Sequence, residues 1–194
     1  AVPDREDNRD VLVSKSGKTL MELPAGAIVG TSSLRRTMNL KNLRDDLVIK
    51  QLRGNIHTRL NKLKNDNYDA ILLAAAGLKR VGLESEITEY LDPNKFLPAP
   101  AQGVLYIQCR ENDDEIKTIL KSIHNEEIAK VVAIEREFSK IFDGGCHTPM
   151  GCNCELNGDL VTLNGIFFDG DKGYCDSITA NINEGIKIAQ KLAG

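Results

Sequence analysis

The sequence contains no tryptophan, few aromatic residues (5%) and no apolar run of the roughly 18 residues that indicate a membrane-spanning helix. Its first ten residues, AVPDREDNRD, are charged and polar, which is not the pattern of a secretory signal peptide. The four tyrosines and five phenylalanines are not interleaved with basic residues, so they offer little for stacking on bases. We therefore expect neither a membrane nor a nucleic acid as a partner.

Histidine and cysteine are also scarce. We expect the three histidines, His57, His124 and His147, at the surface or in packing rather than in catalysis. Five cysteines, an odd number in a chain without signs of secretion, predict reduced thiols and a cytoplasmic location. The net charge of −3 gives no general attraction to a polyanion, yet six arginines fall between residues 35 and 80. Such a local concentration suits a small anionic ligand better than a long polyanion.

The N-terminal half alternates apolar segments, polar or glycine turns and amphipathic segments. Strand patterns cover residues 9–15, 23–30, 46–54 and 68–78, and helical patterns cover 31–43 and 55–65. A repeat of strand, turn and amphipathic helix is typical of βαβ units, so it predicts an α/β domain with a parallel sheet.

The C-terminal part has a different composition, and the change falls near residue 123. A long segment with helical spacing, 126–144, precedes short alternating runs and a closing helical segment. Turn signals separate those runs at Asn157-Gly158, Asn164-Gly165 and Asp169-Gly170. This pattern predicts a small α+β domain with an antiparallel meander.

The segment TSSLRR at 31–36 follows a predicted strand and opens a predicted helix. Hydroxyls and free backbone N–H groups at a helix N-terminus attract anions. Arg35 and Arg36 add two positive charges there, which costs about 0.3–1 kcal/mol unless an anion is present. The sequence therefore predicts an anion site at this position, although ordinary caps and solvated arginines would leave the same pattern.

Three further arginines are candidates for the same site. Loops after parallel strands emerge at one edge of a sheet, so Arg53 and Arg59 should face the region of Arg35 and Arg36. Arg80 follows the next strand and is a further candidate. Arginine suits carboxylate ligands because its planar fork donates to both oxygens.

Five motifs together resemble the hydroxymethylbilane synthase (porphobilinogen deaminase) family in order and spacing. They are VGTSSLRR at 29–36, LRGNIHTRL at 52–60, YDAILLAAAGLKRVGL at 68–83, LPAPAQG at 97–103 and GGCHTPMG at 144–151. The resemblance implies an enzyme that condenses four porphobilinogen molecules into a linear tetrapyrrole, losing ammonia each time. It also implies a dipyrromethane cofactor, which is joined to one cysteine by a thioether.

The resemblance assigns roles to matching residues. Cys146 would carry the cofactor, although His147-Thr148 replace the Gln-Val that usually follows this cysteine in the family. The remaining roles concern the carboxylates of porphobilinogen and of the growing pyrrole chain. Cofactor contacts would come from Ser33, Arg35 and Arg36, and substrate contacts from Arg53, Arg59 and Arg80.

The resemblance also divides the chain and implies that a part is missing. The divisions are an interdomain lead-in (1–8), an α/β lobe of the periplasmic-binding-protein type (9–97), a return segment to an N-terminal lobe (98–122) and a C-terminal α+β domain bearing Cys146 (123–194). The family's catalytic aspartate belongs to the N-terminal part, which the motifs do not include. We therefore assign no catalytic residue, give no such role to Asp4 or Asp7, and expect this chain alone to be inactive.

The return segment contains an apolar stretch, Val104–Cys109, that reads as a strand whose partners are missing. An unpaired apolar strand tends to associate with other chains. We expect this stretch to be mobile, to pair with a second copy, or to dock on a separately supplied N-terminal part.

Two rival interpretations remain. Cys146, His147, Cys152 and Cys154 have zinc-ligating chemistry, but their spacing departs from common structural sites, so we predict no metal. The chain could instead be a non-enzymatic module that binds small anions, which would not need Cys146. For the cysteine by itself, a small buried apolar role is the ordinary alternative.

Overall fold

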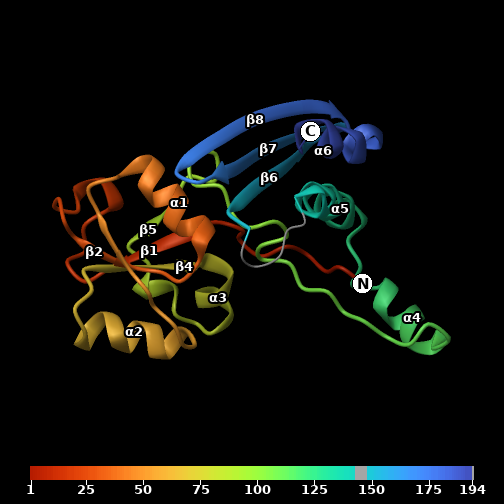
Figure 1. Ribbon diagram of the computed structural model, residues 1–194. Coiled ribbons are helices and arrows are strands. Elements are labelled where there is room, and N and C mark those ends of the chain that lie inside the picture. The colour runs from red at the N-terminus through yellow and green to blue at the C-terminus, as the bar shows by residue number, and fades with distance from the viewer. Residues whose placement is uncertain (143–147, 194) are drawn as a thin grey trace.

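The computed structural model describes residues 1–142 and 148–193, and it shows an α/β lobe joined to a C-terminal domain (Figure 1). The lobe contains β1 (Asp10–Ser14), η1 (Leu20–Glu22), β2 (Ile28–Gly30), α1 (Leu34–Leu43), β3 (Val48–Lys50), α2 (Ile56–Asn65), β4 (Ala70–Ala74), α3 (Ala75–Arg80), η2 (Glu84–Glu86) and β5 (Glu89–Tyr90). Beyond it lie α4 (Asp114–Lys121), α5 (Glu126–Ile141), β6 (Met150–Asn157), β7 (Leu160–Asp169), β8 (Lys172–Asn181), η3 (Ile182–Glu184) and α6 (Gly185–Ala193).

The lobe has a mixed five-stranded sheet in the order β3-β2-β4-β1-β5. Strand β2 runs parallel to β3 and β4, whereas β1 runs antiparallel to β4 and β5. The α/β class is confirmed, and the sheet, expected to be rich in parallel strands, is mixed because β1 runs antiparallel to both of its neighbours. The segment between β1 and β2 contains only the short helix η1, and a strand's own residue pattern carries no information on its direction.

Helices cover both faces of this sheet, with α1 on one side and α2 and α3 on the other (Figure 1). Successive residues of a strand point to opposite faces, so a strand buried on both sides must be apolar throughout. In β1, Leu12 packs in the core beneath α1 with Leu40, while Val11 and Val13 pack with Leu60 of α2. The continuous apolar runs VLV and AILLA follow from this arrangement.

The C-terminal domain is the predicted antiparallel meander, β6-β7-β8, packed against α5 and α6. Positive φ angles at Gly158 and Gly170 confirm the turn signals there. The turn expected at Asn164-Gly165 is wrong, because both residues lie inside β7. Gly165 instead permits close packing, since a Cβ at this position would lie 2.7 Å from Cζ of Phe138.

The strand expected over Val104–Cys109 is not formed. Backbone pairing there is limited to one residue, because Ile107 and Ala1 exchange N–H···O bonds of 2.8 and 2.9 Å. Leu105, Tyr106 and Ile107 remain exposed. The segment leads to α4, which projects away from both the lobe and the C-terminal sheet (Figure 1).

The helices in the described part of the chain are all too short or too polar to cross a membrane.

Candidate functional site

The three hydroxyls of TSSLRR serve three different local structures. Ser33 is the N-cap of α1, where its Oγ accepts from the Arg36 N–H at 3.4 Å. Thr31 Oγ1 accepts from the Ser33 N–H. Ser32 Oγ joins this turn to the next loop, donating to the Leu52 carbonyl and accepting from the Leu52 N–H. These hydrogen bonds thus stabilise the turn in which α1 begins.

Arg35 and Arg36 are buried against the end of the sheet, with side chains only 6% and 11% exposed. Both contact the fully buried carboxylate of Asp10, the first residue of β1. Arg35 also donates to the Leu97 carbonyl at 2.7 Å and to Gln102 Oε1 at 3.3 Å. Arg36 donates from Nε to Asp10 Oδ1 at 2.9 Å and from Nη1 to a backbone carbonyl of β4.

This cluster contains two guanidinium groups and one carboxylate. Burial alone would raise the pKa of Asp10, but the charges and hydrogen bonds of Arg35 and Arg36 outweigh it and hold that pKa below its ordinary value. Burial lowers the pKa of Arg36, and the charges of Arg35 and Arg59 act in the same direction against that of Asp10. An arginine in a protein nevertheless stays protonated. The cluster therefore holds one positive charge in excess.

Asp10 was missed at the sequence level because the residue pattern of β1 does not give the direction of the strand. In the antiparallel register Asp10 lies opposite Ala74, the last residue of β4. It therefore reaches the edge where β2 and β4 end and α1 begins. In a parallel sheet the first residue of β1 would lie at the opposite edge. A charged residue directly before the apolar run VLV was the one available signal.

The other three candidate arginines are more accessible. Arg53 is exposed in the loop between β3 and α2, and Arg59 follows it on α2. Arg59 Nε donates to the Gly54 carbonyl at 2.8 Å. Gly54 has a φ of +127°, and a Cβ there would lie 2.6 Å from Thr58 Cγ2, so the loop requires glycine.

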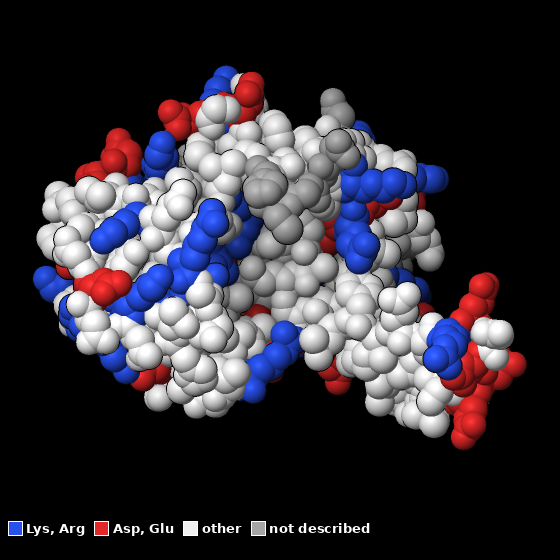
Figure 2. Space-filling model, turned by 60° about the horizontal axis from the view of Figure 1, so that its bottom comes forward, with Lys and Arg blue, Asp and Glu red and all other residues white. Residues whose placement is uncertain are grey.

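Arg80 ends α3 and donates from Nη2 to the Gly103 carbonyl at 2.7 Å. It thereby contacts the turn 98–103 rather than a carboxylate. Figure 2 shows Lys and Arg side chains gathered in a band across the lobe. The charge of Arg59 acts to lower the pKa of Arg36. Within residues 1–142 and 148–193, no hydrogen bond or ion pair joins Arg80 directly to Arg36 or Arg59.

A second buried ion pair connects the lead-in to the C-terminal domain. Arg5 donates from Nη1 and Nη2 to the two carboxylate oxygens of Glu135 on α5, at 2.8 and 2.9 Å. Glu135 also accepts from the backbone N–H groups of Ala101 and Cys154. Arg5 Nε donates to the Gln102 carbonyl, and Gln102 Nε2 donates to Asp10 at 3.2 Å. The turn 98–103 therefore contacts both buried ion clusters.

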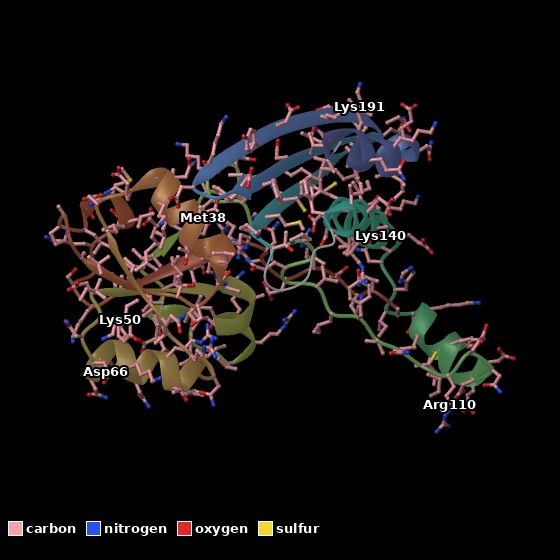
Figure 3. All side chains as sticks on the ribbon, in the orientation of Figure 1. Met38, Lys50, Asp66, Arg110, Lys140 and Lys191 are labelled. Carbon is pink, nitrogen blue, oxygen red and sulfur yellow. The ribbon has the colours of Figure 1, made fainter. Side chains whose placement is uncertain are left out.

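Apolar contacts also place the C-terminal domain beside α1. Met38 of α1 packs with Leu97, Ile166 and Phe168 in a small buried cluster. Figure 3 shows Met38 on the side of α1 that faces the C-terminal sheet. Lys41, one turn later, pairs with Asp171 in the turn between β7 and β8 at 3.1 Å. Helix α1 thus contacts the C-terminal domain and also supplies the arginine pair.

Cys146 and His147 lie outside the described residues. Cys152 and Cys154 lie in β6 and pack in the core against α5. Burial raises the pKa of the Cys154 thiol to about 12, and raises that of Cys152 well above its ordinary value. In the described ranges, no three His, Cys, Asp or Glu side chains gather as metal ligands would.

Comparison with protein families agrees with the resemblance. The model described as "Porphobilinogen deaminase, dipyromethane cofactor binding domain" matches residues 1–118. The model described as "Porphobilinogen deaminase, C-terminal domain" matches residues 129–194. The chain belongs to the porphobilinogen deaminase family.

Relatives in this family align along nearly all of the chain. A porphobilinogen deaminase of Fusobacterium nucleatum subsp. nucleatum is 65% identical over 193 residues, covering 100% of this chain and 64% of the relative. One from Oceanobacillus iheyensis is 50% identical, covering 88% of this chain and 56% of the relative. One from Exiguobacterium sp. is 45% identical, covering 99% of this chain and 63% of the relative. The chain thus spans less than two thirds of the length of these relatives.

Proposed function

We propose that this chain is the cofactor-bearing and carboxylate-binding part of a hydroxymethylbilane synthase, a transferase of tetrapyrrole and haem biosynthesis. That enzyme condenses four porphobilinogen molecules into a linear tetrapyrrole with loss of ammonia. The observation that carries the proposal is the pair Arg35 and Arg36, which has one carboxylate for two guanidinium groups in a chain of this family. We expect no turnover by this chain alone.

The side chains at the site fit a ligand that carries several carboxylates. A dipyrromethane cofactor, attached at Cys146, would supply the pyrrole end on which rings are added. Arg36 and Arg59 would share one of its carboxylates, which the effect of the Arg59 charge on Arg36 supports, and Ser33 caps the helix that carries Arg36. Arg35 would act beside them, while Arg53 and Arg80 would face the substrate and the growing chain. The role of the protein residues is to hold these carboxylates in place and neutralise them.

Two further parts of the proposal concern partners and location. The exposed side chains of Leu105, Tyr106 and Ile107 support docking of Val104–Cys109 on another chain or on an N-terminal part. The four cysteines that the structure describes are free thiols, which fits the expected cytoplasmic location.

An intact-mass measurement tests the cofactor assignment. The denatured chain is weighed before and after exposure to preformed linear tetrapyrrole, and any adduct is mapped by peptide fragmentation. We expect a pyrrole adduct on Cys146, formed when the thiol displaces the terminal hydroxyl of the tetrapyrrole with loss of water, and absent in Cys146→Ser. The adduct adds four pyrrole units, or two once the outer two rings are released by hydrolysis. Cys175→Ser is the matched control, because Cys175 is an exposed thiol on β8.

The outcomes separate the rival functions. An adduct that stays in Cys146→Ser would reject the assignment of Cys146. If neither this chain nor a version extended at its N-terminus forms an adduct, the synthase proposal fails. A small-anion-binding module would then be the better account, because the arginine pair would still bind carboxylates.

A further inference from the structure

Asp10 is a completely buried carboxylate whose hydrogen-bonding capacity is filled from three side chains. Its Oδ1 accepts from Arg36 Nε at 2.9 Å and from Gln102 Nε2 at 3.2 Å, and its Oδ2 accepts from Arg35 Nη1. A buried charge is tolerated when it is paired and hydrogen-bonded in this way. None of the five family motifs includes this residue, which lies 21 positions before the first residue of TSSLRR, Thr31.

The two arginines that share Asp10 differ in how many of their N–H donors are already used in hydrogen bonds within the protein. Arg35 uses both terminal nitrogens on Asp10, the Leu97 carbonyl and Gln102 Oε1. It therefore joins β1 to the turn 98–103. Arg36 contacts Asp10 and the Leu72 carbonyl, which leaves part of its five-donor fork for a ligand. The positive charge of Arg59, which is more accessible, also acts on Arg36.

Arg36 can bind a ligand tightly only if its side chain is already held in one orientation. A free arginine side chain loses rotamer entropy when it is ordered, and a second cation nearby would repel it. The bond from Nε to Asp10 removes this freedom before any ligand arrives. It also balances one of the two buried positive charges, so that a single excess charge remains for an incoming carboxylate.

We infer that Asp10 is a positioning residue of the carboxylate site, which holds the Arg36 guanidinium in the orientation that binds a pyrrole carboxylate. This inference rests on the proposed function, because it assumes that Arg36 binds such a ligand. Asp10 itself does not touch the ligand. Its effect on binding is therefore expected to pass through Arg36 alone.

A calorimetric titration of the chain with porphobilinogen, well below the unfolding temperature, tests this role. Asp10→Asn keeps the shape but turns an amide donor towards the arginine donors, and we expect binding to weaken about tenfold or more. Asp10→Glu keeps the charge but displaces the carboxylate by one methylene, and we expect weaker binding here too. Asp46→Asn, which removes the carboxylate paired with Arg44 in the same lobe, should bind like the unaltered chain.

A purely structural role is distinguished by a double-mutant cycle. If Asp10 acts through Arg36, the affinity of Asp10→Asn/Arg36→Gln should equal that of Arg36→Gln, since the second change has nothing left to remove. Additive losses in folded variants would overturn the inference. Should Asp10→Asn fail to fold, Asp10→Glu decides: unchanged affinity overturns the positioning role, and reduced affinity with a native circular dichroism spectrum supports it.

Failure of the proposed function gives a different result. If the unaltered chain does not bind porphobilinogen, the carboxylate site is wrong and the inference falls with it. If the unaltered chain and the folded Asp10→Asn variant bind equally well, only the role of Asp10 is rejected.

Discussion

The arginines of this chain occupy two kinds of surroundings. Arg5, Arg35 and Arg36 are buried and paired with carboxylates that are themselves fully buried. Arg59 and Arg80 lie nearer the solvent, and each donates to a backbone carbonyl. A buried charge without a partner costs several kcal/mol, whereas an accessible one costs little. The first group thus maintains the arrangement of the lobe and domain, although Arg36 keeps part of its donors for a ligand. The second group is accessible to ligands.

The largest effect is expected where a buried pair is broken. Glu135→Ala would leave the Arg5 guanidinium without its carboxylate and would remove the acceptor of the Ala101 and Cys154 N–H groups. We expect the free energy of unfolding to fall by about 3–5 kcal/mol, measured by urea denaturation. Glu137→Ala, whose carboxylate accepts from Gln190 at the surface of the same helix, is the control. Equal losses in the two variants would remove the distinction between buried and accessible charges.

A smaller effect is expected from acid. The folded-state pKa of Asp10 is depressed, so its contribution to stability is complete above its unfolded pKa of about 3.8 and is lost as the pH falls through the lower folded value. The stability of the unaltered chain should therefore decline more steeply below about pH 4 than that of Asp10→Asn. Urea midpoints between pH 2.5 and 6 measure this difference. Parallel curves for the two proteins would show that Asp10 does not carry the charge.

The smallest effect on stability is expected at the accessible arginines. Arg59→Gln should weaken porphobilinogen binding about tenfold, because one charge-assisted hydrogen bond is lost. The urea midpoint should not change measurably, since Arg59 donates only to the carbonyl of Gly54 in a turn that α2 also supports. Lys64→Gln removes a charge from the same helix and should change neither property. A large loss of stability in Arg59→Gln would place this arginine with the buried group.

The charge clusters show how far the candidate site could be read from the sequence. The grouping of arginines after successive strands was visible, because each motif lies within a few residues of its strand. Their different burial was not visible, because it depends on partners far away in the sequence. Arg35 and Arg36 lie 25 and 26 residues from Asp10, and Arg5 lies 130 residues from Glu135. The roles of Ser33, Arg35, Arg36, Arg53, Arg59, Arg80 and Cys146 in binding remain predictions. The domain limits at residues 9, 98 and 123 also remain predictions.

The glycines of the C-terminal sheet also show what the sequence alone could not decide. Hairpin turns at Gly158 and Gly170 were predicted because each depends on the backbone freedom of one residue. Gly165 gave an equal signal, but its position under Phe138 depends on packing between β7 and α5. A glycine that permits a turn and a glycine that makes room for a neighbour look alike in one sequence.

Local residue order by itself determined the strands buried on both faces, the helix that begins after Ser33, and the meander of the C-terminal domain. These features depend on periodicity and on capping within a few residues. Only the tertiary structure decided the direction of β1, and with it the position of Asp10 beside Arg35 and Arg36. Strand direction and ion pairing depend on contacts between distant segments, and the energy of a buried charge depends on which partner the fold brings to it.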